Sequence, residues 1–145
     1  IREEGFPPQN LCLELTERCR FLDISILQQS IRFWKKLGIR TALDDFGTGY
    51  SALSLIFELP VDEIKIDKSF IDNIEEDRSK QILLKAILEC TTELGMQVCI
   101  EGIETERVRD YVRDCFRPSI FQGYYYSKPI GYSAARAWIG QHYTA

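Results

Sequence analysis

The hexapeptide Asp44-Asp45-Phe46-Gly47-Thr48-Gly49 follows a short apolar run suited to a buried strand and precedes a stretch with the pattern of a helix start. Two adjacent carboxylates at the end of a strand, followed by two glycines that permit a sharp loop, make a good site for a hard metal ion. The same pattern also fits a turn in which an aspartate caps the next helix. The hexapeptide alone leaves both interpretations open.

The composition indicates one globular core. The chain has 145 residues, 45% of them hydrophobic, and a formal net charge of -4. Its apolar runs are far shorter than the roughly 20 residues of a membrane span, so we expect no membrane contact from this segment. No general basic surface is available for a polyanion, so we expect no binding of polymeric nucleic acid. A phosphate ligand would be held locally or through metal ions.

The cysteines form neither an even set nor a metal-binding pattern. We interpret them as reduced and mostly buried thiols, which favours a cytoplasmic location. They are Cys12, Cys19, Cys90, Cys99 and Cys115.

Strand and helix patterns alternate five times along the chain. The alternation predicts a parallel sheet with right-handed crossovers, either an open doubly wound sheet or part of an eight-stranded barrel. The expected strands are 11–15, a strand ending at Asp44, 63–67, 97–101 and about 119–123, with helices between them and a last helix near 133–142.

The position of the polar residues favours the barrel. Each expected strand carries one polar or charged residue at or near its carboxyl end: Glu14, Asp44, Lys65, Glu101 and Gln122. Isolated buried charges are very costly, so several converging charges must be paired or must hold a cation. Taken singly, Glu14 also fits a salt-bridged acid, and Glu101 with Glu104 also fits an acidic helix start. The inner acids, with one lysine and one amide, suit divalent cations and a metal-activated water.

With these residues assembled, the chain resembles the EAL family of cyclic di-GMP phosphodiesterase domains, which act in bacterial signalling. The motifs span nearly the whole chain: Glu14-Leu15-Thr16-Glu17, Asp44 to Ser51, Ile64-Lys65-Ile66-Asp67, Glu101-Gly102-Ile103-Glu104-Thr105, and Gln122-Gly123-Tyr124 followed by Lys128-Pro129. The resemblance implies a TIM-like (β/α)8 barrel that hydrolyses cyclic di-GMP to linear 5′-pGpG with Mg2+ or Mn2+, two ions per complete site. It also implies a homodimer of the complete domain, and sensor or GGDEF-type domains preceding it.

The resemblance implies a role for each matching residue. Glu14, Asp44 and Glu101 correspond to ligands of a first metal, and Asp45 to a ligand serving a second. Lys65 corresponds to the lysine that holds the attacking water, while Glu104 and Gln122 match positions near the second metal and the water. Glu17 corresponds to an acid that holds the following loop and links it to metal binding and dimer contacts. The remaining substrate-binding or loop positions are Phe46, Gly47, Thr48, Gly49 and Pro129.

Two elements of the family pattern are absent from this sequence: the Glu-Ala-Leu tripeptide with its nearby Arg, and a metal-binding Asn. We therefore expect residues 1–145 to be the C-terminal portion of one EAL domain, an incomplete barrel of about five βα units, inactive when isolated. Such a piece would be a remnant of a full domain or would pair its open sheet edges with a second copy. The alternatives are a catalytically silent cyclic di-GMP-binding or regulatory interaction module, and an unrelated barrel hydrolase with a two-metal site.

Overall fold

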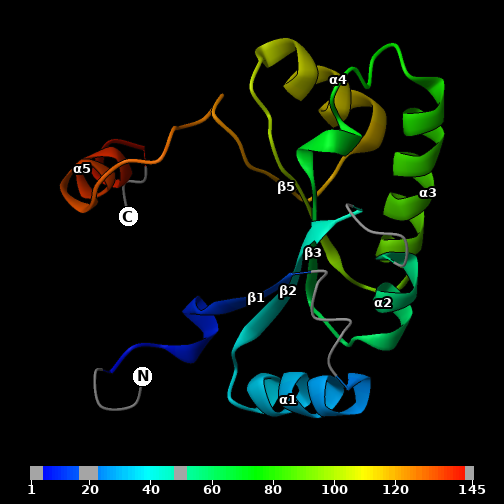
Figure 1. Ribbon diagram of the computed structural model, residues 1–145. Coiled ribbons are helices and arrows are strands. Elements are labelled where there is room, and N and C mark those ends of the chain that lie inside the picture. Colours follow the sequence, from blue (N-terminus) through cyan, green and yellow to red (C-terminus); the bar gives the residue numbers. More distant parts are fainter. Residues whose placement is uncertain (1–4, 17–22, 48–51, 143–145) are drawn as a thin grey trace.

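The computed structural model describes residues 5–16, 23–47 and 52–142. These residues form one sheet of five parallel strands in the order β1-β2-β3-β4-β5, as the alternating pattern predicts (Figure 1). The strands are β1 (Cys12–Thr16), β2 (Arg40–Phe46), β3 (Glu63–Ile66), β4 (Gln97–Ile100) and β5 (Ile120–Phe121). The α-helices are α1 (Ile24–Lys36), α2 (Ala52–Glu58), α3 (Arg78–Glu93), α4 (Glu106–Phe116) and α5 (Tyr132–His142), and two short 3-10 helices are η1 (Pro8–Asn10) and η3 (Lys68–Phe70).

The helices α1 to α4 cover one face of the sheet, whereas α5 lies apart from them, beyond the opposite face (Figure 1). The strand side chains on the covered face, such as Leu43, Ile64 and Ile100, are fully buried against Ile31 of α1 and Leu84 of α3. An open doubly wound sheet would carry helices on both faces. A single layer of crossover helices is the arrangement of a barrel wall, so the expected incomplete barrel of five βα units is confirmed.

The uncovered face carries the polar side chains. In the strand pairing, Glu14 is the partner of Ala42 and Lys65 is the partner of Cys99, and paired residues face the same side of the sheet. These residues therefore form the inner surface of the barrel wall. Because all five strands are parallel, their carboxyl ends meet at one edge of the sheet. The polar residues near those ends are thereby brought to the same place.

Local hydrogen bonds determine where two of the elements begin or end. Helix α4 begins at Glu106, because the Thr105 side chain accepts a hydrogen bond from the Val108 amide and caps the helix there. Strand β5 is shorter than the expected 119–123 and ends at Phe121: the Gln122 amide still donates to the Ile100 carbonyl of β4 at 2.9 Å, but the Gln122 carbonyl accepts from the Ile103 amide, in the loop after β4, at 3.0 Å. In α3, Leu84 is fully buried, whereas the neighbouring Leu83 is 44% exposed.

The expectation of mostly buried cysteines is wrong for the thiols that the structure describes. Cys99 is buried in a central strand, but Cys12 and Cys115 are exposed and Cys90 is intermediate; Cys19 lies outside the described residues. Cys12 belongs to β1, an edge strand of this sheet, so its apolar neighbours in the sequence do not ensure burial. All four described cysteines are free. Over the same residues, no helix combines the length and apolar character that crossing a membrane requires.

Alkylation with iodoacetamide should distinguish these thiols. Burial, the largest cause, raises the pKa of Cys99 to about 12, so little thiolate forms at pH 8 and the side chain is also shielded. Peptide mapping by mass spectrometry should show Cys115 labelled in the native protein and Cys99 labelled only after denaturation. Labelling of Cys99 as fast as Cys115 would contradict the burial of β4.

Candidate functional site

A β-bulge in β2 places two adjacent aspartates outside the hydrophobic core. Leu43 pairs with Ile64 and Phe46 with Ile66, so three steps along β2 oppose two steps along β3. The extra residue lets Leu43 and Phe46 both pack in the core under the helices, with 0% and 1% exposure. In a regular strand they would face opposite sides of the sheet.

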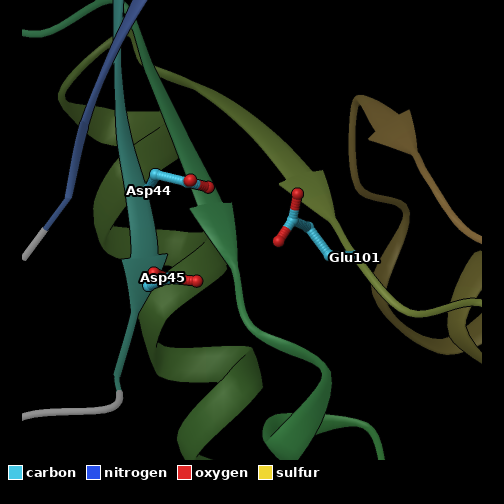
Figure 2. A group of neighbouring side chains, drawn as sticks. All are labelled: Asp44, Asp45 and Glu101. Atoms are coloured by element: carbon cyan, nitrogen blue, oxygen red, sulfur yellow. The ribbon is translucent and has the colours of Figure 1, made fainter.

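The backbone at Asp45 is left-handed, with φ of 54°. Aspartate is among the few residues besides glycine that adopt this conformation at modest cost. The bulge and the left-handed residue together turn the carboxylates of Asp44 and Asp45 toward Glu101 at the end of β4 (Figure 2). One carboxylate oxygen from each of the three residues lies within 4.8 Å of the other two. The strand end thus contributes two ligand groups instead of one.

The Lys65 ammonium lies at the centre of the remaining charges. Its Nζ is 2.8 Å from Glu101 Oε1 and 3.0 Å from both Glu14 Oε1 and Asp44 Oδ1. Burial by itself would lower the pKa of Lys65, but its close ion pairs with the three carboxylates outweigh it and raise the pKa. Lys65 is therefore a permanent cation at neutral pH. Its pairing with Glu14 is the most exposed to solvent, because that carboxylate side chain is 49% exposed.

A second group of expected site residues surrounds an adjacent pocket of about 300 Å3, where the loops after β3, β4 and β5 meet. Glu104 reaches this pocket from the loop after β4, and its Oε1 lies 2.6 Å from Lys68 Nζ. The lining includes Glu101, so the pocket adjoins the acidic cluster; its other polar residues are Asp67, Lys68, Glu104, Gln122 and Tyr124.

Two glycines allow the loops around the pocket to approach each other. A Cβ at Gly102, where φ is 70°, would lie 2.5 Å from the Lys68 side chain. A Cβ at Gly123 would lie 2.2 Å from the Ile103 carbonyl oxygen and 2.3 Å from the Ile103 amide nitrogen. Gln122, directly before Gly123, is therefore held beside the 101–104 loop by backbone contact that a larger residue would prevent.

The other residues suggested by the resemblance are placed differently. Phe46 points into the core and cannot present its side chain to a ligand. Gly47 contacts the ring of Phe70, and Pro129 is exposed in the segment leading to α5. Glu17, Thr48 and Gly49 lie outside the described residues. Lys68 and Phe70 were not singled out by the sequence, because both follow the end of β3 in a turn where alternation carries no signal.

The acidic cluster fits a divalent metal ion. Its donors are carboxylate oxygens, the ligands that Mg2+ and Mn2+ prefer. Asp44 Oδ1 is buried and accepts no hydrogen bond of good geometry; its polar contact is the Lys65 ammonium. The Asp44 oxygen therefore keeps lone pairs with which it can bind a metal ion.

Parallel strands covered by one layer of helices form the wall of a TIM-type barrel. In such barrels the active site lies at the carboxyl ends of the strands, where the carboxylates of this chain converge. The family model described as "EAL domain" matches residues 1–129, and the chain belongs to the EAL domain family.

Known proteins of this family resemble the chain over most of its length. The EAL domain of Mycobacterium smegmatis DcpA superimposes with a TM-score of 0.88 at 34% identity, covering 99% of this chain and 64% of that one. A Klebsiella pneumoniae BlrP1 complex with manganese and cyclic di-GMP gives 0.79 at 29% identity, covering 88% and 32%. The Escherichia coli protein named "Probable cyclic di-GMP phosphodiesterase PdeG" is 38% identical over 123 residues, 85% of this chain and 24% of that protein. The chain spans between 14% and 24% of the length of eight curated relatives that it matches.

A substitution at Gly123 tests the close loop contact. Gly123→Ala should lower the free energy of unfolding by about 1–3 kcal/mol, because the new methyl group overlaps the Ile103 backbone. Gly140→Ala in α5 is the matched control: nothing lies within 4 Å of its Cβ position, and alanine favours helix by roughly 0.5–1 kcal/mol. Urea denaturation measures both. Equal stability of Gly123→Ala and the wild-type chain would contradict the contact.

Proposed function

We propose that residues 1–145 are the C-terminal portion of an EAL domain whose complete form hydrolyses cyclic di-GMP to linear 5′-pGpG. The observation that carries the proposal is the convergence of Asp44, Asp45, Glu101 and Lys65 at the carboxyl edge of the wall. Membership in the family, the name of PdeG and the ligands of BlrP1 support the substrate and the metal. The coverage of DcpA, 64% of that domain, supports the assignment of the chain to part of a larger barrel.

In this proposal Glu14, Asp44 and Glu101 hold a first divalent cation and Asp45 serves a second, as Mg2+ or Mn2+. Such ions neutralise the phosphodiester and lower the pKa of a coordinated water. Lys65 contacts three of these carboxylates. Because each carboxylate has two oxygens, some oxygens can bind a cation while others keep their contact with the Lys65 ammonium.

We assign Lys65 to a contact with the attacking water or with a phosphate oxygen. Its three donors face Glu14, Asp44 and Glu101, so a donor becomes available where one of these carboxylates turns to a cation instead. The side chain is only 8% exposed, so a hydrogen bond from it is little weakened by solvent. In the hydrolysis, the water oxygen bonds to phosphorus, one ribose 3′ oxygen leaves, and a proton passes to that oxygen. An ammonium that stabilises charge on phosphorus-bound oxygens favours this step.

Glu104 and Gln122 line the adjacent pocket together with Glu101. We assign them to the second metal and to orientation of the water. Glu17, Gly47, Thr48 and Gly49 are assigned to the loop that follows Asp45, and Pro129 to the substrate-facing rim. We further propose that the complete domain is a cytoplasmic homodimer and follows sensor or GGDEF-type domains in its parent protein.

The proposal is tested by measuring 5′-pGpG formation from cyclic di-GMP with Mg2+ or Mn2+. This chain should be inactive, whereas a form extended N-terminally to a complete barrel should be active. In the extended form, Asp44→Asn and Lys65→Ala should each lower turnover about 100-fold or more, with an unchanged circular dichroism spectrum. Glu89→Gln, a change from acid to amide on the exposed face of α3, is the control and should leave turnover unchanged.

Near-normal product formation by Asp44→Asn or Lys65→Ala would contradict the assigned roles. If the extended protein is inactive but binds cyclic di-GMP tightly, the chain is part of a binding module and the hydrolase proposal is wrong.

A further inference from the structure

We propose that η3, the turn Lys68–Phe70 after β3, positions the end of β2, which carries Asp45, relative to the loop after β4, which carries Glu104. One side of the turn contacts Gly47, directly after β2, and the other side contacts Gly102 and Glu104 in the loop after β4. Phe70 and Lys68 are then positioning residues, which act on the site through the segments that they hold. The inference rests on the proposed function for its consequence in metal binding.

The contact directly after β2 is made by the ring of Phe70. A Cβ at Gly47 would lie 1.9 Å from Phe70 Cε2 and 2.4 Å from Cζ, so the ring fills the space that any other residue would need. Gly47 has φ of 101°, which also favours glycine. The amide of Asp67 donates to the Phe46 carbonyl at 3.4 Å, which adds a backbone link. Gly47, two residues after Asp45, is thus packed against the turn.

The contact with the loop after β4 is made by Lys68. Its aliphatic carbons lie 2.5–3.0 Å from the Cβ position of Gly102, directly after Glu101. Its Nζ lies 2.6 Å from Glu104 Oε1. One side chain therefore packs against the start of this loop and pairs with the acid further along it.

The turn is held independently of both segments. The Asp67 carboxylate accepts from the Ser69 amide at 2.9 Å and caps the turn. Lys80 from α3 reaches across and donates to the Ser69 carbonyl at 2.6 Å and to the Asp72 carbonyl at 2.7 Å. A turn anchored to a long helix provides a fixed reference for the segments on either side.

The consequence is preorganisation of the site. Asp45 lies at the end of β2 and Glu104 in the loop after β4, the two strands that flank β3, and a glycine with positive φ, Gly47 or Gly102, lies two residues from each acid. Without lateral contacts these two segments would sample several arrangements, and ordering them would reduce affinity for a metal ion. The contacts of the turn hold these two segments in one arrangement before any ligand binds.

Hydrogen exchange of the 145-residue chain, followed by NMR, tests the contacts directly. Two amides report on the two segments: Asp67 donates to Phe46, and Ile103 donates to Gln122. Phe70→Ala should speed exchange of the Asp67 amide about tenfold, and Lys68→Met should speed exchange of the Ile103 amide about tenfold. Each change corresponds to about 1.4 kcal/mol in the free energy of local opening. Phe70→Leu, which retains apolar bulk but lacks the ring, should give a smaller effect of the same kind and serves if the alanine variant does not fold.

Two matched controls remove the same groups elsewhere. Phe33→Ala removes a ring from α1 that is 59% exposed, and Lys85→Met removes an ammonium from α3 whose side chain is 69% exposed. Both should leave the two amides unchanged. Wild-type rates at Asp67 in Phe70→Ala and at Ile103 in Lys68→Met would overturn the proposal.

Mn2+ binding, measured by electron paramagnetic resonance, tests the consequence. Phe70→Ala and Lys68→Met should each weaken Mn2+ about tenfold relative to the wild-type chain and the controls. Faster exchange with unchanged Mn2+ affinity would overturn the positioning role. If the wild-type chain binds no Mn2+, the metal assignment of the proposed function fails for this chain, while the exchange rates still decide whether the turn holds the two segments.

Discussion

The site depends on one electrostatic constraint: the carboxylates that converge at the carboxyl edge of the sheet must be compensated. Burying unpaired charges costs several kcal/mol each, so a fold that brings Asp44 and Glu101 together requires a cation between them. Lys65 supplies it from the central strand β3, with contacts of 2.8–3.0 Å. The ammonium comes from a rigid strand that has neighbours on both sides, so its position is fixed by the ladder rather than by a loop.

The bulge in β2 couples this polar edge to the hydrophobic core. Phe46 is 1% exposed under the helices, and its burial favours the register in which one extra residue bulges from the strand. The same register directs both aspartates to the site, so the geometry of the ligands is maintained by packing on the far side of the sheet. The left-handed backbone at Asp45 is a small local cost that this packing offsets.

The sequence was informative about which elements form and which residues approach each other, and less so about register. Alternating patterns identified the five strands and the inward position of Lys65, because a period of two fixes the face of a side chain. They could not identify the bulge, since a regular strand would have separated Asp44 from Asp45. The contacts of Phe70 and Lys68 also escaped prediction, because they depend on how loops from three strands meet. Leu83 fits a helical apolar pattern but lies outside the buried stripe.

The single positive charge of Lys65 does not compensate all the carboxylates around it. Glu14, Asp44 and Glu101 surround Lys65, so three carboxylates share one ammonium and an excess of two negative charges remains within this group when all three are ionised. Solvent screens part of this excess at Glu14, whose side chain is 49% exposed, but much less at Glu101, whose side chain is 17% exposed. A divalent cation compensates such an excess more fully than a second lysine would, and it needs no side chain of its own to be packed into the barrel. Binding of a divalent cation therefore explains why the site has more carboxylates than the charge of Lys65 can compensate.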